Sequence, residues 1–134
     1  MIDTHLHLDD PAFSGKVDEI IAQMTLCGVE LAINNSCDFA TMHSGVALAD
    51  KYEQIFATVG MHPHDSKSFD DAFERDMRAL AANPKVVAVG EIGLDYHYDL
   101  SNRDVQRDVF ARQIEIADEL KLPLTLHNME DSFR

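Results

Sequence analysis

A histidine pair near the amino terminus has a spacing that suits metal binding. His5 and His7 lie in a segment, Ile2 to Leu8, whose alternating residues predict a β-strand. Because successive side chains of a strand point to opposite faces, we expect both imidazoles on the same face. Two such imidazoles can bind one divalent cation. The spacing alone is weak evidence, since ordinary surface histidines also produce it by chance.

Further candidates come directly after apolar segments. These segments predict later strands, and the candidates at their ends are His62, His64, Glu91 and His127. A buried, unpaired glutamate is costly, so Glu91 beside the apolar run Val86 to Val89 favours a functional role over a core role. Imidazole and carboxylate together suit zinc, manganese or magnesium. We therefore expect one or two divalent ions as cofactors.

Other polar residues have simpler interpretations. His43 is expected on the solvated side of a helix, and Tyr96 and His97 either pack within a loop or belong to the site. Four acids predict the solvated face of one helix, helped at its start by the helix dipole: Asp70, Asp71, Glu74 and Asp76.

The elements that position these residues alternate regularly. Apolar strands are expected at about 2–8, 29–33, 55–59, 86–89 and 122–126, with amphipathic helices at about 17–27, 39–52, 70–82 and 102–120. This order predicts an α/β fold with a parallel sheet covered by helices. Such sheets place active sites at the carboxyl ends of their strands, where the candidates also lie.

Two architectures fit the alternation: an open doubly wound sheet, or the opening part of an eight-stranded (β/α) TIM-type barrel. A barrel needs about 250 residues, and the 134 here supply roughly half. The chain ends seven residues after His127, where a loop should enter another helix. We therefore expect residues 1–134 to form a single domain that is the amino-terminal part of an incomplete barrel.

Composition narrows the function classes. With 11 Lys+Arg against 24 Asp+Glu, the net charge of −13 argues against nonspecific binding to nucleic acid or anionic membranes, which relies on basic patches. A phosphate substrate remains compatible, because bound cations reverse the local field. The sequence contains neither a membrane-length apolar run nor a signal-like start, which predicts a cytoplasmic protein. Cys27 and Cys37 have no paired spacing and are interpreted as ordinary thiols.

Four motifs, in this order along the chain, together resemble the TatD family of metal-dependent deoxyribonucleases. They are Asp3-Thr4-His5-Leu6-His7-Leu8-Asp9, Gly60-Met61-His62-Pro63-His64, Gly90-Glu91-Ile92-Gly93-Leu94-Asp95-Tyr96 and Leu122-Pro123-Leu124-Thr125-Leu126-His127. The resemblance spans essentially the whole chain. It implies an amidohydrolase-like barrel that hydrolyses DNA phosphodiester bonds with one or two divalent metals.

The resemblance also implies roles for single residues. His5 and His7 resemble the first-strand metal ligands, Glu91 the carboxylate that contacts or bridges the metals, and His127 a ligand of the second metal. His62 and His64 resemble residues that line the pocket toward the substrate phosphate. The family's catalytic aspartate and a further histidine ligand would lie beyond the chain end, so hydrolysis by this chain is expected to be impaired.

Two alternatives stay open at this point. One is another amidohydrolase-type reaction, on a cyclic amide, a lactone or an amine, although many of those relatives carry a lysine at the fourth-strand position. The other is a non-enzymatic remnant that keeps the fold and the ligands. Open sheet edges also predict self-association.

Overall fold

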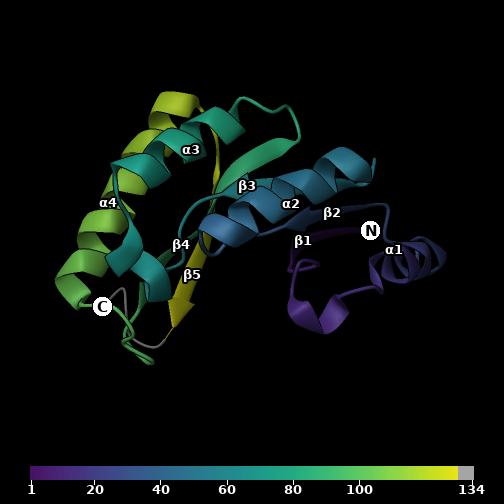
Figure 1. Ribbon diagram of the computed structural model, residues 1–134, viewed down its shortest axis with the longest axis horizontal. Coiled ribbons are helices and arrows are strands. Elements are labelled where there is room, and N and C mark those ends of the chain that lie inside the picture. Colours follow the sequence, from purple (N-terminus) through teal and green to yellow (C-terminus); the bar gives the residue numbers. More distant parts are fainter. Residues whose placement is uncertain (130–134) are drawn as a thin grey trace.

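The computed structural model describes residues 1–129 and contains one curled, five-stranded parallel sheet (Figure 1). Neighbouring strands follow one another in chain order. A doubly wound sheet reverses direction partway, so this sequential order is that of a (β/α) barrel, of which the sheet is a part. The strands are β1 (Ile2–Leu6), β2 (Leu31–Asn34), β3 (Ile55–Val59), β4 (Val86–Asp95) and β5 (Leu124–Met129).

Four α-helices connect the strands, with two short 3₁₀ helices after β1 and β3. They are α1 (Val17–Leu26), α2 (Phe39–Lys51), α3 (Asp71–Ala81), α4 (Arg103–Leu120), η1 (Pro11–Phe13) and η2 (Pro63–Ser68). Side chains of Asp38, Asp70 and Asn102 accept hydrogen bonds from first-turn N–H groups, which explains where α2, α3 and α4 begin. The helix predictions are confirmed to within a few residues.

The core lies between the sheet and its helices. Figure 1 shows α1 at one end of the molecule, near the amino terminus, and α3 and α4 together at the other end, beside β4 and β5. Fully buried side chains come from both layers, namely Ile55, Val59, Val89 and Ile92 from strands and Met42, Met77 and Ile116 from helices. Continuous apolar strands are what a sheet covered by helices requires.

Four of the five predicted strands have a wrong boundary, and β2 for example begins at Leu31 and not at residue 29. The strand predicted to end at Val89 continues to Asp95, because β4 resumes pairing with β5 after a register shift between Val89 and Ile92. β5 begins at Leu124 and not at residue 122, since Pro123 has no N–H to donate. β1 ends at Leu6, where the N–H of Leu8 turns to the Asn34 side chain at 2.6 Å.

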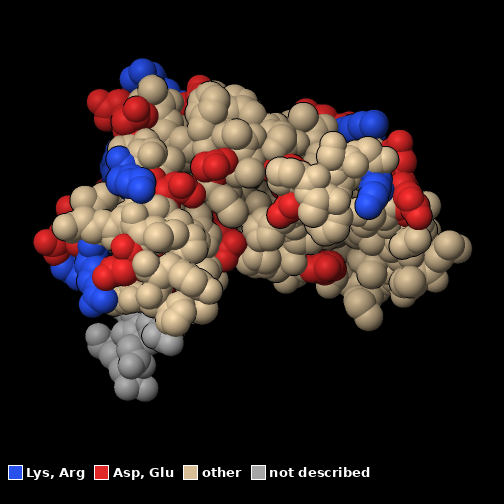
Figure 2. Space-filling model, turned by 60° about the horizontal axis from the view of Figure 1, so that its bottom comes forward, with Lys and Arg blue, Asp and Glu red and all other residues tan. Residues whose placement is uncertain are grey.

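The surface distribution of charged side chains agrees with the excess of acidic residues in the sequence. In Figure 2, basic side chains lie toward the two ends of the molecule, whereas acidic ones also lie across its middle.

Within residues 1–129, no helix is both long and apolar enough to cross a membrane. Cys27 and Cys37 are free thiols, and burial raises the pKa of Cys37 to about 12. The cytoplasmic location and the single-domain organisation stay predictions.

Candidate metal centre

Glu91 lies at the centre of the candidate site. Its side chain comes from the middle of β4, not from the strand end that the sequence predicted. The residue is only 6% exposed, and its N–H donates to the Ser36 carbonyl at 2.9 Å. This bond ties β4 to the loop after β2 and fixes the backbone that carries the carboxylate.

One carboxylate oxygen of Glu91 faces the histidine pair of the first strand. Its Oε2 lies 3.2 Å from His5 Nε2 and 3.7 Å from His7 Nε2. The two Nε2 atoms are 3.2 Å apart, so both imidazoles lie on one side, as the alternation predicted. The three side chains form a group whose ligand atoms lie within 4.8 Å of one another.

The hydrogen bonding of His7 leaves a lone pair directed at this group. His7 Nδ1 lies 3.0 Å from the Asn35 carbonyl, which can only accept, so Nδ1 carries the hydrogen. A neutral His7 then presents its Nε2 lone pair toward Glu91. Metal-binding histidines characteristically donate their other N–H to a carbonyl or carboxylate.

The spacing of these atoms fits a shared cation. Two ligands at about 2.0–2.2 Å from one ion stand roughly 2.8–3.6 Å apart at octahedral to tetrahedral angles. The separations among His5, His7 and Glu91 are 3.2, 3.2 and 3.7 Å, close to that range. Nitrogen and carboxylate donors in this arrangement suit zinc or manganese.

The second oxygen of Glu91 faces β5. His127 Nδ1 lies 2.9 Å from Glu91 Oε1, and His127 Nε2 lies 2.9 Å from Asp95 Oδ2. If Nε2 donates to Asp95, the Nδ1 lone pair points at a carboxylate oxygen, an arrangement that a cation or a proton between the two atoms would stabilise. His127 is the fourth residue of β5 and not its end, because the strand extends to Met129.

His62 and His64 lie beside His127, at the start of η2. His62 Nε2 lies 3.1 Å from His127 Nδ1, and His62 Nδ1 accepts from the backbone N–H of His64 at 3.1 Å. Burial and the neighbouring His127 lower the pKa of His62 to about 4, so this imidazole is neutral at pH 7. A neutral His62 with an occupied Nδ1 carries its hydrogen on Nε2.

Asp95 also belongs to the site, although its sequence position did not indicate this. Its Oδ2 lies 2.6 Å from His64 Nε2 as well as 2.9 Å from His127, and the residue is fully buried. Burial raises the pKa of this carboxyl, but hydrogen bonds from Tyr98 N–H, His127 and His64 outweigh it and lower the pKa to about 2. Asp95 therefore stays ionised and orients both imidazoles.

A family model described as "TatD related DNase" matches residues 2–133. The chain belongs to this family. Among curated TatD-family relatives, the "uncharacterized metal-dependent hydrolase YabD" of Bacillus subtilis is 35% identical over 130 residues, covering 97% of this chain and 51% of the relative. The "3'-5' ssDNA/RNA exonuclease TatD" of Cronobacter sakazakii is 35% identical over 127 residues, covering 95% and 48%.

Solved structures of TatD proteins share the fold. The Escherichia coli K12 TatD homologue YJJV superposes with a TM-score of 0.89 at 31% identity, over 97% of this chain and 51% of that one. A TatD-family hydrolase of Entamoeba histolytica gives the same TM-score at 21% identity, over 97% and 50%. The chain thus spans about half the length of the TatD relatives that it matches.

One of the simpler interpretations of polar residues in this TatD-family chain needs correction. His43 is exposed as expected, and its Nε2 contacts the exposed acid Asp76 at 3.1 Å. Glu74 is not a solvated acid: it is 17% exposed and accepts hydrogen bonds from Arg78 at 3.0 Å and Arg112 at 2.7 Å. Arg112 lies on α4, 38 positions further along the chain, so helix periodicity could not identify it as a partner of Glu74.

Proposed function

We propose that this chain supplies the amino-terminal part of the active site of a metal-dependent hydrolase that cleaves phosphodiester bonds in DNA. The observation that carries the proposal is the position of Glu91, whose two oxygens face different histidines at 3.2 and 2.9 Å. A carboxylate in that position can bridge two cations, and two-metal sites are typical of enzymes that cleave phosphodiesters. The relatives named as exonucleases support nucleic acid as the substrate.

Each residue has a proposed role. His5, His7 and Glu91 would hold one cation, and Glu91 with His127 would hold a second. His62 and His64 face the substrate phosphate. His62 Nε2–H, which lies 3.1 Å from His127 Nδ1, would be available to a phosphate oxygen if His127 Nδ1 held a cation.

When bound, divalent cations would supply a Lewis acid for the phosphoryl oxygens and a water acidic enough to attack near neutral pH. The family resemblance implies that an aspartate near the last barrel strand accepts the proton of that water. This chain spans about half the length of its relatives. We therefore expect the 134-residue chain to bind metal but to hydrolyse DNA slowly.

Metal binding tests the proposed ligands. Mn²⁺ or Zn²⁺ titrated into the chain and followed by calorimetry should bind, and Glu91→Gln should weaken binding more than about tenfold. His43→Asn is the matched control, because His43 is exposed and contacts an acid outside the site. Equal affinity in Glu91→Gln and wild type would contradict the assignment, and absence of binding would favour a non-enzymatic remnant.

Activity tests the reaction class. With Mn²⁺ or Mg²⁺, the chain should release nucleotides from single-stranded DNA slowly and leave dihydropyrimidines intact. Glu91→Gln should abolish that release. Turnover of the cyclic amide in place of DNA would support the other amidohydrolase-type reaction, and turnover of DNA at the rate of a full-length relative would overturn the expected impairment.

A further inference from the structure

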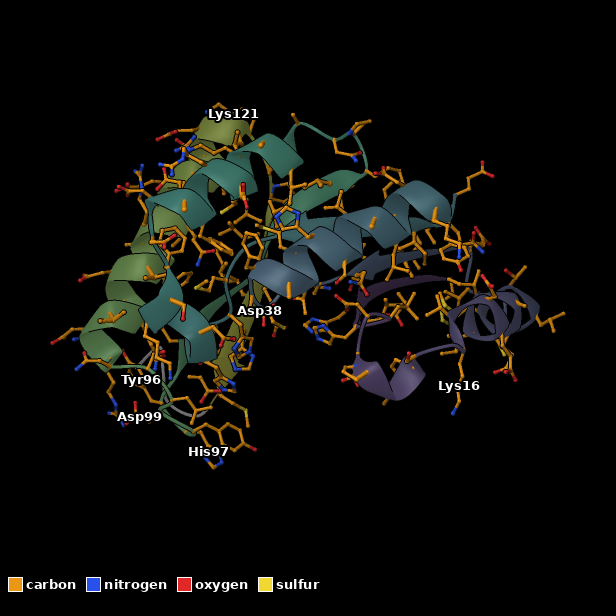
Figure 3. The ribbon with its side chains drawn as sticks, viewed as in Figure 1. Lys16, Asp38, Tyr96, His97, Asp99 and Lys121 are labelled. Carbon is orange, nitrogen blue, oxygen red and sulfur yellow. The ribbon has the colours of Figure 1, made fainter. Side chains whose placement is uncertain are left out.

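The loop between β4 and α4, residues 96–102, carries exposed rings beside the candidate metal centre. It follows Asp95, the carboxylate that orients His64 and His127. In Figure 3, Tyr96, His97 and Asp99 lie near the end of β5, with His97 lowest and pointing outward from the molecule. The proposed function leaves this loop without a role.

Hydrogen bonds fix the backbone of the loop. Asp95 Oδ1 accepts from the N–H of His97 at 3.1 Å and from the N–H of Tyr98 at 2.9 Å. The same carboxyl group therefore orients the site histidines with one oxygen and holds the loop with the other. Rings on such a loop are positioned before a ligand arrives, which lowers the entropy lost on binding.

A second set of contacts braces the loop from α4. The Arg103 guanidinium lies 4.5 Å from the centre of the Tyr96 ring, and Arg107 donates to the Tyr96 hydroxyl at 3.0 Å. These contacts occupy Tyr96 and leave Tyr98 as the large exposed ring of the loop, with 57% of the residue accessible to solvent.

Tyr98 connects the loop to the site. Its ring centre lies 5.6 Å from that of His64 and 4.6 Å from that of His97, each in an edge-on arrangement. Neither histidine ring lies parallel to the tyrosine ring, and more than half of Tyr98 stays exposed, which suits a ring that receives a planar group by stacking. That group would lie next to whatever His64 contacts.

The charges around the loop favour contact with bases over contact with phosphates. Arg103 is paired with Asp99 at 3.0 Å, and Arg107 is paired with Asp104. Both cations are thus partly neutralised, within a chain whose net charge is −13. Affinity for a polyanion at this rim must then come largely from apolar and stacking contacts, which every nucleobase can make.

We propose that Tyr98, flanked by His97, is a stacking platform for an unpaired nucleobase next to the phosphate held by His62 and His64. This inference rests on the proposed function and names the residue that favours single strands. Bases of a duplex are already stacked on their neighbours, so only an unpaired end or a single strand can supply a free face.

Binding without turnover tests the platform. The probe is a short fluorescent single-stranded oligonucleotide with phosphorothioate linkages, titrated into the 134-residue chain with Ca²⁺ and followed by anisotropy. Tyr98→Ala should lower the affinity about tenfold, and Tyr98→Phe should keep it, because stacking needs the ring and not the hydroxyl. Leu26→Ala is the control, since Leu26 is 87% exposed on α1, outside the candidate site.

An abasic probe sharpens the test. If the ring stacks on a base, an oligonucleotide that lacks that base binds wild type and Tyr98→Ala equally. The loss of affinity from removing the base and the loss from removing the ring are then not additive. Three results would overturn the platform. The two losses of affinity could be additive, Tyr98→Ala could bind the intact oligonucleotide as tightly as wild type does, or wild type could fail to bind it. Tyr98-dependent binding by a chain that never hydrolyses DNA would uphold the platform and contradict the proposed reaction alone.

Discussion

Gly93 shows how a single residue keeps β4 close to the strand that carries His127. It pairs in register with His127, and its φ is +150°. A methyl group at Gly93 would lie 1.9 Å from the His127 carbonyl oxygen, which is backbone and cannot move aside cheaply. The close approach of β4 to β5, and with it the 2.9 Å contact between Glu91 and His127, depends on the absence of a side chain.

We predict that Gly93→Ala destabilises the chain by about 3 kcal/mol in urea unfolding, through overpacking and backbone strain. Gly28→Ala is the matched control, because Gly28 also has a positive φ, +82°, but its added methyl would contact nothing within 4 Å. That control should lose only about 1 kcal/mol. Equal losses in the two variants would show that backbone conformation, and not the close approach, decides the effect.

The candidate site could be predicted from the sequence to the extent that its residues lie in or directly after apolar segments of strand-like pattern. His5, His7, Glu91 and His127 meet in space because parallel strands bring their carboxyl-terminal parts to one edge. Asp95 could not be predicted in the same way, since its role depends on β4 continuing past Glu91 and on two histidines from other segments. The signal that was present is the short spacing, since Asp95 is an acid only four residues after Glu91.

At the scale of elements, α4 holds the loops around the site through two buried glutamines. Gln113 Oε1 accepts from Met61 N–H at 2.7 Å, and its Nε2 donates to the Met61 carbonyl at 3.1 Å. Gln106 makes the same pair of bonds with the backbone of Asp95, at 2.8 and 3.1 Å. Met61 precedes His62, so the helix positions both the histidine and the carboxylate beside it.

Gln113→Met should cost about 3 kcal/mol of stability, because the Met61 N–H and carbonyl lose their buried partners while the side-chain volume stays similar. Urea unfolding measures the loss. Gln23→Met on α1, an exposed position, should change stability by less than about 0.5 kcal/mol. A loss at Gln113 no larger than at Gln23 would show that the amide does not hold the Met61 backbone.

The contact between α3 and α4 predicts a pH dependence. Hydrogen bonding to Arg112 lowers the pKa of Glu74, and Arg78 lowers it further. Partial burial acts in the opposite direction. A lowered pKa in the folded state means that Glu74 stabilises the fold above its unfolded pKa, near 4.3, and loses that contribution as pH falls through the lower folded value. Glu74→Gln should therefore be less stable than wild type at pH 7.

The difference between wild type and Glu74→Gln should shrink as the pH falls below about 4 and be retained between pH 6 and 8. Thermal unfolding over that range measures it, with Glu30→Gln as an exposed acidic control. A difference that stays constant with pH would contradict the proposed linkage.

Strands and helices could be predicted from periodicity and caps, whereas the extents of β4 and β5 could not. The segment Gly90 to Asp95 contains two glycines and two acids, a composition that strands usually avoid. The segment is in a strand because tertiary pairing with β5 continues through Asp95 and Met129 after the register shift. Pairing of this kind depends on a partner more than 30 residues away, and local sequence does not encode it.

At the scale of the whole molecule, the sheet has two outer strands. Among residues 1–129, β1 pairs only with β2 and β5 pairs only with β4, so each leaves one edge without a strand. Four apolar residues on or beside these strands are substantially exposed: Ile2, Leu31, Leu124 and Leu126. Self-association therefore stays a prediction with a structural basis, since unpaired edges and exposed apolar side chains favour pairing with another chain.

Leu126→Lys tests that prediction at the more exposed of the β5 leucines, 54% accessible against 36% for Leu124. Wild type should show an average mass that rises with concentration in light scattering or sedimentation, and the variant should stay closer to one chain, because a charge on an outer strand opposes edge pairing. Leu26→Lys, at a position on α1 that is still more exposed (87%), should associate as wild type does. A wild-type chain that is monomeric over the whole range and unfolds cooperatively would show that the open edges do not drive association, and that the half-barrel is stable as a single chain.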